Sequence, residues 1–273
     1  MGKSTKDARD HFYRQGKRDG YRARSAYKLI HLDEQYALFG RGQHALGAEA
    51  DDAFYKALGA ELSAEARSTL RAENRQPLCV LDLCAAPGSW SQVLSRTLGP
   101  AGARIVAVDL QAMAPVQGVR QVVGDITTEA TAQAVEQAMR AGNTTKPSAP
   151  AEADLIVCDG APDVTGVQHL DEYVQSQLLL AAVTMALRTL RTGGTFVAKV
   201  FVHEHTESAR LLRAQLERLF THVEYAKPAS SRASSAEHFV VCLGLERREA
   251  SIETVQHSFL GDLAGYNAPI DAN

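Results

Sequence analysis

The chain has 273 residues, of which 45% are hydrophobic and 22% are charged, and its formal net charge is −3. This composition is ordinary for a soluble globular protein, and the length suits one large α/β domain with a buried core. No apolar run approaches the roughly 18 residues of a membrane span. No apolar signal core follows the first basic residues, so we expect a cytoplasmic protein rather than a membrane or secreted one.

The four cysteines support the same expectation. Each lies in or beside an apolar run, and none forms a C-x-x-C pair; they are Cys79, Cys84, Cys158 and Cys242. We therefore predict buried thiols in a reducing compartment rather than disulfides or a metal site.

The charge is distributed unevenly along the chain. Residues 1–28 carry nine Lys or Arg against three Asp, a balance of +6, and the rest carries 20 basic and 29 acidic residues, a balance of −9. A basic arm on an acidic body indicates contact with a polyanion such as nucleic acid, and a solvated basic tail is the alternative. Tyr13, Tyr21 and Tyr27 alternate with these charges and either stack on bases or anchor the arm to the body.

In chain order, the first predicted helix spans Arg24–Tyr36. Its apolar residues recur at helical spacing, Ser25 is a candidate cap, and Lys28 lies within it. The next stretch, Gly40–Pro77, is rich in Ala, Glu and Arg and has only short helical patterns. We interpret this stretch as an insertion packed on the surface, without identifiable chemistry.

A buried strand, a tight turn and a helix follow. Leu78–Leu83 is an apolar run, Cys84–Ser89 consists of small residues and a proline, and Trp90–Leu98 is amphipathic. A turn of small residues lets a ligand approach the backbone closely, and the N-terminus of the next helix favours negative charge. This turn is therefore the first candidate for a ligand site.

The remaining chain alternates between strands and helices. Further strands are predicted at Arg104–Leu110, Gln121–Val123, Asp154–Asp159, Thr195–Phe201, His222–Ala226 and Glu237–Leu243. Helices are predicted at Thr128–Met139, His169–Leu190 and Ser208–Phe220, and loops at Ala141–Ala153 and Lys227–Ala236. This alternation predicts a single doubly wound α/β domain over residues 1–273, made of a basic arm and helix (1–39), the insertion (40–77), a core (78–245) and a tail (246–273).

Four predicted strands carry an aspartate at their carboxyl ends: Asp82, Asp109, Asp125 and Asp159. A parallel sheet places these ends on one edge, which is where ligands bind in open α/β folds. A turn or a helix cap explains any single one of them equally well. Four carboxylates at equivalent places would repel one another unless a ligand used them, so we predict a ligand site along this edge.

The glycine turn narrows the choice of ligand. Asp109 lies 21 residues after Gly88, near the interval of about 20 residues between a glycine turn and a ribose-binding acid. The turn lacks G-x-G-x-x-G, which disfavours a pyrophosphate cradle and a dinucleotide-dependent oxidoreductase. An acid-lined nucleoside pocket suits S-adenosylmethionine, because its hydroxyls and amine donate to carboxylates and its sulfonium is cationic. The turn alone also fits other enzymes of small ligands.

Lys199 stands in an otherwise apolar strand. Burial would remove its hydration, so it needs a partner or a function unless it snorkels to the edge. Asp159 ends the preceding strand, and Lys28 and Glu237 would complete a group of two lysines and two acids. A ribose 2′-hydroxyl needs a base to become a nucleophile, and a lysine serves when burial and a neighbouring cation lower its pKa. Sequence spacing leaves open whether the four meet.

Eight longer motifs then make the sequence similar to a known family. They occupy Asp10–Leu29, Asp82–Ser95, Asp109–Val119, Gly124–Thr127, Cys158–Gly166, Gly193–Phe201, Lys227–Gly244 and Gly261–Tyr266. With these motifs in this order, the chain resembles the FtsJ-like ribose 2′-O-methyltransferases. Within them it resembles the eukaryotic cytosolic enzymes that methylate the tRNA anticodon loop.

The resemblance implies a Rossmann-like methyltransferase sheet with a final antiparallel strand, and S-adenosylmethionine as the cofactor. It implies a catalytic Lys-Asp-Lys-Glu tetrad, with the second lysine as general base, which maps to Lys28, Asp159, Lys199 and Glu237. The implied cofactor residues are Gly88, Trp90, Asp109, Asp125 and Asp159, with Asp82, Pro87 and Ser89 as further candidates from the same strand and turn. Trp90 would otherwise be interpreted as a core residue, and no metal is expected.

The resemblance also implies that a separate helical-repeat or WD-repeat protein helps to place the tRNA. Gly40–Pro77 and Ala141–Ala153 are longer than is usual in the family but touch no motif, so they leave RNA docking and partner contacts open. The nearest alternative is the same chemistry on ribosomal RNA or an mRNA cap. A catalytically silent RNA-binding scaffold is a more distant one, because a scaffold has no need for a buried lysine.

Overall fold

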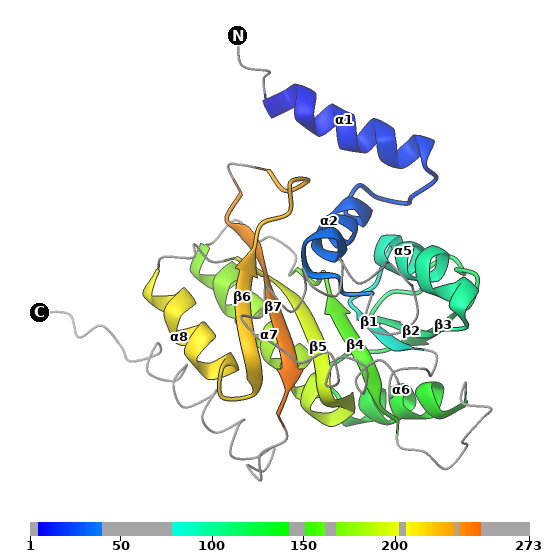
Figure 1. Ribbon diagram of the computed structural model, residues 1–273, viewed down its shortest axis with the longest axis vertical. Helices are drawn as coiled ribbons and strands as arrows, with labels where there is room; N and C mark the ends of the chain where they lie inside the picture. The colour runs from blue at the N-terminus through cyan, green and yellow to red at the C-terminus, as the bar shows by residue number, and fades with distance from the viewer. Residues whose placement is uncertain are drawn as a thin grey trace, which may run out of the picture.

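The computed structural model describes residues 5–39, 78–141, 151–161, 168–201, 206–232 and 235–246, and for residues 5–10 and 168–173 only the backbone. The predicted insertion at 40–77, most of the predicted loop at 141–153 and nearly all of the tail lie outside these ranges. The extent of the single domain across those segments stays a prediction. Figure 1 shows the described residues as one twisted sheet with helices on both faces and α1 beyond them.

The sheet has seven strands. They are β1 (Cys79–Leu83), β2 (Arg104–Asp109), β3 (Val119–Val123), β4 (Ala153–Cys158), β5 (Leu190–Phe201), β6 (Phe220–Ala226) and β7 (Glu237–Leu245). The described helices are α1 (Thr5–Arg18), α2 (Ala26–Tyr36), α5 (Ser89–Leu98), the short 3₁₀ helix η1 (Gly99–Ala101), α6 (Glu129–Ala141), α7 (Gln168–Thr189) and α8 (Glu207–Leu216). Among the described helices, none is both long and apolar enough to cross a bilayer.

The strand order is β3-β2-β1-β4-β5-β7-β6. Neighbouring strands pair in parallel except at β7, which pairs antiparallel with both β5 and β6. This confirms the predicted doubly wound, mostly parallel sheet with its final strand antiparallel. The strand order reverses between β1 and β4, and in such sheets ligands bind beyond the carboxyl ends at this point.

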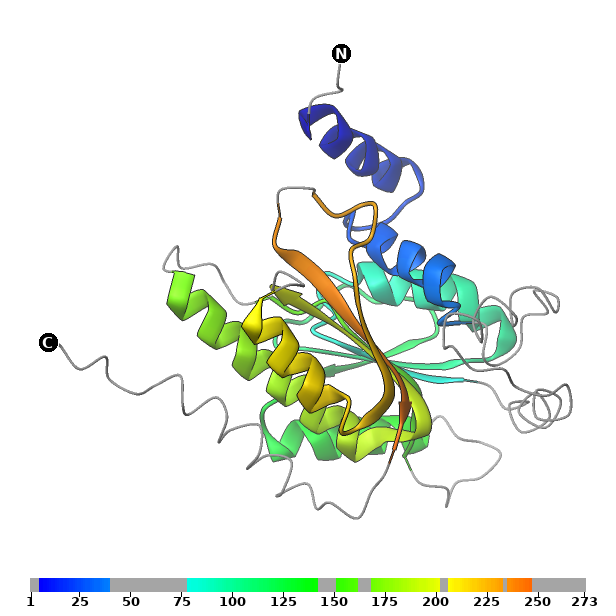
Figure 2. The ribbon, with the colours of Figure 1, turned by 60° about the vertical axis from the view of Figure 1, so that its left-hand side comes forward.

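Alternation along the strands divides the core into two clusters. In β1, Leu81 and Leu83 pack with α6, α7 and α8, whereas Val80 packs on the opposite face with α2 and α5. Figure 2 shows the sheet between these two helical layers. The central strands are buried on both faces, which explains why they read as nearly continuous apolar runs.

Several element boundaries differ from the prediction. α1 was not predicted as a helix, because TKDARDHFYRQGKR is polar and lacks an apolar stripe. Residues 190–194, expected to end a helix, instead begin β5. α8 ends at Leu216 rather than at residue 220, because Leu219 and Phe220, which continue the apolar spacing, pack into the core beside the sheet. The four cysteines are free; three are buried, and Cys84 is half-buried.

Candidate active site

Four predicted site residues meet at the carboxyl ends of β4 and β5. Lys199 Nζ lies 3.1 Å from Asp159 Oδ1 and donates a hydrogen bond of 2.7 Å to the Asp159 carbonyl oxygen. Lys28 Nζ lies 2.7 Å from Glu237 Oε2 and 3.6 Å from Asp159 Oδ1. Residues from α2, β5, β7 and the end of β4 therefore form one continuous cluster, which the sequence could propose but not demonstrate.

Both lysines of this cluster are buried: Lys28 is 9% exposed and Lys199 is 8% exposed. Two positive and two negative groups balance one another, which offsets the cost of removing them from water. Burial acts to raise the pKa of Glu237. The charge and hydrogen bond of Lys28, a hydrogen bond from Ser231 and the charge of Lys199 outweigh it, so this pKa lies below its ordinary value.

The register of the sheet explains this arrangement. Lys199 pairs with Phe239, and Phe201 pairs with Glu237, across β5 and β7. Since side chains alternate along a strand, Lys199 shares its face with Val197, which packs in the cluster of α2 and α5. Asp159 directly follows the last residue of β4. The register of the sheet and the end of β4 thus bring Lys199 and Asp159 together.

The glycine turn lies beside this cluster. Gly88 has a φ of +102° and forms the N-cap of α5, a conformation that glycine adopts without strain. Asp109 Oδ2 accepts a hydrogen bond of 2.8 Å from the Ala86 amide, and its Oδ1 accepts one of 2.8 Å from the Gln111 amide. The carboxylate at the end of β2 is thereby locked against the turn that follows β1.

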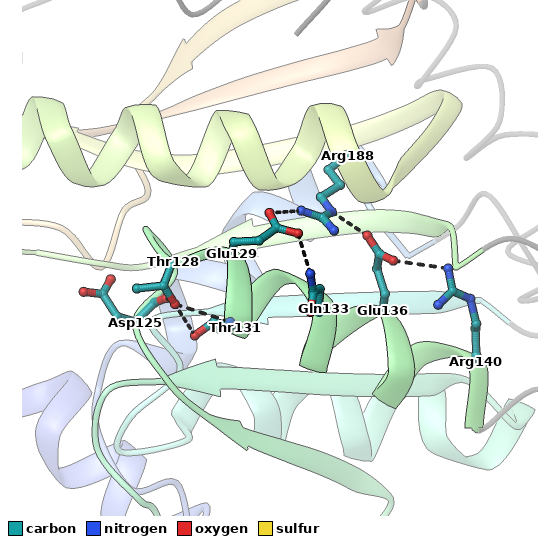
Figure 3. A network of polar contacts seen from close by, with 8 residues as sticks. All are labelled: Asp125, Thr128, Glu129, Thr131, Gln133, Glu136, Arg140 and Arg188. Carbon is teal, nitrogen blue, oxygen red and sulfur yellow. Dashed lines mark hydrogen bonds and ion pairs between the residues drawn. The ribbon is translucent and has the colours of Figure 1, made fainter. Parts of the chain in front are cut away.

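Asp125 lies in the loop between β3 and α6. Its Oδ1 accepts hydrogen bonds from the amide and hydroxyl of Thr127, at 2.9 and 2.8 Å, and its carbonyl accepts one of 3.0 Å from Thr128 Oγ1. Figure 3 shows Asp125 with Thr128 and Thr131 near the start of α6, and a separate set of polar contacts further along α6 that reaches Arg188 of α7. Arg188 pairs with Glu129 and Glu136, so the helix that starts after Asp125 is fastened to its neighbour.

Comparison with known proteins decides the family. The model of the FtsJ-like methyltransferase family matches residues 21–245. The chain belongs to this family. It is 43% identical over 261 residues to a tRNA (cytidine(32)/guanosine(34)-2′-O)-methyltransferase of Mus musculus, covering 95% of this chain and 66% of that protein. The chain thus spans slightly less than two thirds of that relative.

A relative in Schizosaccharomyces pombe with the same name is 44% identical over 251 residues, covering 89% of this chain and 72% of that protein. Among solved structures, one described as a ribosomal RNA methyltransferase from Plasmodium falciparum superposes with a TM-score of 0.60 at 23% identity, covering 84% of this chain and 100% of that one. This structural match supports the fold alone.

Two residues of the FtsJ-like turn do not line the rim as expected. Asp82 is 1% exposed and accepts a hydrogen bond of 2.6 Å from Ser91 Oγ, and burial raises its pKa to about 7. Asp82 lies within β1, on the face toward α5, rather than at its open end. It therefore supports the first turn of α5, and its carboxylate is buried although the charges of Asp109 and Asp159 reach it.

Trp90 is 2% exposed, its Nε1 donates a hydrogen bond of 2.9 Å to the Ser25 carbonyl, and its ring centroid lies 5.6 Å from that of Phe239. The side chain is a core residue, as the residue pattern alone indicated. Because the Trp90 side chain is buried, only the backbone of this residue is available to a cofactor. Ser89 is 2% exposed and its Oγ has no hydrogen-bond partner among the described residues, whereas Pro87 is exposed.

The three tyrosines of the basic arm differ in their contacts. Tyr27 is buried and its hydroxyl donates a hydrogen bond of 2.6 Å to Asp19 Oδ2. The Arg96 guanidinium lies 4.5 Å from the centroid of the Tyr21 ring. Tyr13 is 51% exposed, and Lys17 Nζ lies 4.8 Å from the centroid of its ring. Tyr21 therefore joins the arm to α5, and the buried Tyr27 joins Asp19 to α2.

Two residues near the active site were not identified from the sequence. Gln175 of α7 is 7% exposed and donates a hydrogen bond of 3.0 Å to the carbonyl of Lys199. Ser231 Oγ donates a hydrogen bond of 2.8 Å to Glu237 Oε1. Gln175 acts from a helix 24 positions away, which no local spacing reveals, whereas Ser231 lies only six positions before Glu237, in a Ser-rich loop with no feature that separates it from its neighbours.

Proposed function

We propose that this FtsJ-like protein transfers a methyl group from S-adenosylmethionine to ribose 2′-hydroxyls of tRNA, in the anticodon loop. The observation that carries the proposal is the buried cluster of Lys28, Asp159, Lys199 and Glu237 beside the glycine turn. The names of its relatives, which specify positions 32 and 34 of tRNA, support the choice of substrate. The same chemistry on ribosomal RNA or an mRNA cap is the competing substrate assignment.

The residues around the turn fit the proposed cofactor. The Ser89 hydroxyl is buried without a partner among the described residues, which is a rare and costly state unless a ligand or water satisfies it. Gly88 allows close approach to the backbone, and Asp109 and Asp125 offer carboxylate acceptors to hydroxyl and amine groups. We therefore assign cofactor binding to Gly88, Ser89, Asp109 and Asp125, with the amide of Trp90. S-adenosylmethionine, when bound, supplies an activated methyl group.

The lysines and acids then have separate tasks. Lys199 Nζ, in its uncharged form, accepts the proton that the ribose 2′-hydroxyl loses as its oxygen becomes a nucleophile. Asp159 holds Lys199 through both its carboxylate and its carbonyl. Glu237 holds Lys28, whose positive charge faces the same carboxylate of Asp159. Positioning within this buried group contributes the rest of the catalysis.

The surface beside Lys199 fits a nucleotide. Phe201 is 38% exposed, and its ring centroid lies 5.8 Å from Lys199 Nζ. An open aromatic ring next to the proposed base is a platform on which a nucleobase can stack. Exposed basic residues of α1, namely Arg14, Lys17 and Arg18, supply attraction for phosphates. Together they favour an RNA substrate over a small molecule.

The proposal also includes a cellular compartment and a partner protein. We assign the enzyme to the cytoplasm and expect a helical-repeat or WD-repeat helper protein to assist tRNA placement, as the family resemblance implies. A chain that offers one short basic segment and an otherwise acidic composition is suited to sharing its RNA contacts with a partner.

The decisive experiment measures transfer of a labelled methyl group to purified tRNA, with and without candidate helper proteins. Wild-type protein should label tRNA, and Lys199→Ala should abolish transfer while leaving binding of S-adenosylhomocysteine, measured by calorimetry, unchanged. Loss of both methyl transfer and S-adenosylhomocysteine binding in Lys199→Ala would indicate a collapsed site and contradict the general-base assignment. Nucleoside mass spectrometry of tRNA, ribosomal RNA and cap fractions from cells lacking the protein would separate the competing substrates.

A further inference from the structure

Arg22 connects three segments that are distant in sequence. It lies between α1 and α2, outside the cluster of lysines and acids. Its amide donates a hydrogen bond of 2.8 Å to Gln92 Oε1 on α5. Its Nη1 donates one of 2.8 Å to the Pro87 carbonyl, and its Nη2 donates one of 2.9 Å to the Pro115 carbonyl. One guanidinium thus joins the turn after β1 to the loop after β2.

The same guanidinium covers the glycine of the turn. A Cβ atom placed on Gly88 would lie 2.5 Å from Arg22 Nη1 and 3.0 Å from Met113 Sδ. The loop after β2 therefore folds over Gly88, and Arg22 fills the remaining space. This gives Gly88 a second requirement besides its positive φ, since any side chain there would displace the arginine.

The segment that carries Arg22 is held on the outer face of α5. Arg96 donates hydrogen bonds to the carbonyls of Asp19 and Gly20, at 2.7 and 3.1 Å, and its guanidinium stacks on Tyr21. Gln92 Nε2 donates a further hydrogen bond of 3.1 Å to the Gly20 carbonyl. These contacts place the end of the basic arm where the Arg22 side chain reaches both loops.

We propose that Arg22 is a positioning residue for the cofactor, and that through it the basic arm and the cofactor site are energetically coupled. The inference rests on the proposed function, because the proposed cofactor residue Gly88 lies in the first of the two loops that Arg22 joins and Asp109 ends the strand directly before the second. A planar guanidinium donates to two separate carbonyls at once, which a single ammonium group does not reproduce. RNA that orders the arm would favour the arrangement that binds the cofactor, and by linkage the cofactor would strengthen RNA binding by the same factor.

The first test is calorimetric titration of S-adenosylhomocysteine into the full chain. We expect Arg22→Ala and Arg22→Lys to raise its Kd about tenfold, the loss expected for hydrogen bonds to a charged group. Arg140→Ala on α6 is the control, because the Arg140 side chain is 46% exposed and pairs with Glu136 one helical turn away; its Kd should equal that of the wild type. Thermal melting of each variant separates a loss of positioning from a loss of folding, and Arg22→Lys keeps the test valid if Arg22→Ala does not fold.

The second test measures coupling. The affinity of tRNA for wild-type protein should rise in the presence of saturating S-adenosylhomocysteine, and this gain should disappear in Arg22→Lys. Equal Kd values for S-adenosylhomocysteine in wild type and both Arg22 variants would overturn the positioning role, and a cofactor effect on tRNA affinity that survives in Arg22→Lys would overturn the coupling. Failure of the wild type to bind S-adenosylhomocysteine would instead contradict the proposed function itself.

Discussion

Removing one charged group from the cluster of Lys28, Asp159, Lys199 and Glu237 should lower the free energy of unfolding more than removing an oppositely charged pair. Lys28 and Glu237 are 2.7 Å apart, with side chains 11% and 13% exposed. Glu237→Gln leaves two ammonium groups facing one carboxylate, and Lys28→Met leaves two carboxylates facing one ammonium group. An uncompensated buried charge costs about 3–5 kcal/mol. Each single variant should therefore lose about 3 kcal/mol of unfolding free energy, at the low end because both groups keep some contact with water.

The double variant, Lys28→Met with Glu237→Gln, should regain most of this loss. Lys199 and Asp159 then remain as a neutral pair 3.1 Å apart, and replacing a buried ion pair by uncharged groups of similar volume is often neutral. We expect an unfolding free energy within about 1 kcal/mol of the wild type, and hence a strong non-additivity in the double-mutant cycle. Methyl transfer by the double variant should nevertheless be as low as in the single variants. The double variant regains stability, but it still lacks Lys28.

Urea titration followed by tryptophan fluorescence measures these free energies directly. Trp90 is the single tryptophan of the chain, and its ring packs against Phe239, the neighbour in register with Lys199. Its emission therefore reports on unfolding at the site itself. If the two single losses simply add in the double variant, the cluster is not balanced by charge and the reasoning is refuted. Recovery of activity along with stability would show that the pair serves structure alone.

Two further predictions concern substrate binding and pH. Phe201→Leu should raise the KM for tRNA between about fivefold and a hundredfold, since stacking contributes about 1–3 kcal/mol per base. Phe201→Tyr should restore it, and Leu211→Ala on exposed α8 should leave it unchanged; a wild-type KM in Phe201→Leu would exclude the stacking role. Asp82 has a folded pKa of about 7 against an ordinary value of 3.8, so the stability it contributes is present below about pH 4 and is lost as the pH rises through 7. Asp82→Asn should flatten the decline of unfolding free energy between pH 4 and 8, by up to a few kcal/mol, and an unchanged decline would contradict this pKa.

The strands and the acids that end them could be predicted because each depends on local pattern. The apolar run Leu78–Leu83, followed by small residues, predicted β1 and its turn, and Asp109 and Asp159 lie at the ends of β2 and β4. The same rule misplaced Asp82, which stands one residue before the last residue of β1. Alternation turns that side chain to the α5 face rather than to the open edge, and a carboxylate within an apolar run looks the same in sequence in either position.

Residues that act through another residue could not be predicted from the sequence, for a different reason. Gln175 contacts the carbonyl of Lys199, 24 positions away, and Arg22 contacts the carbonyls of Pro87 and Pro115, which lie 65 and 93 positions away. Each acceptor is a backbone carbonyl, which every residue possesses. The residue type at the acceptor position therefore does not indicate the contact. The family motifs include Arg22 among many charged residues of the arm, but nothing in their spacing separates it from Arg18 or Arg24.

The N-terminal segment supplies one member of the proposed catalytic cluster. Asp159, Lys199 and Glu237 are positioned by the sheet, whereas Lys28 reaches Glu237 only because α2 docks on α5 and β7. That docking depends on the bond from Trp90 to the Ser25 carbonyl and on Phe239, whose ring lies 5.6 Å from Trp90 and 5.8 Å from Lys28 Nζ. Without the segment, Glu237 would lose the cation whose charge and hydrogen bond lower its pKa. The proposed RNA-binding arm and the charge balance of the proposed catalytic cluster therefore depend on the same packing.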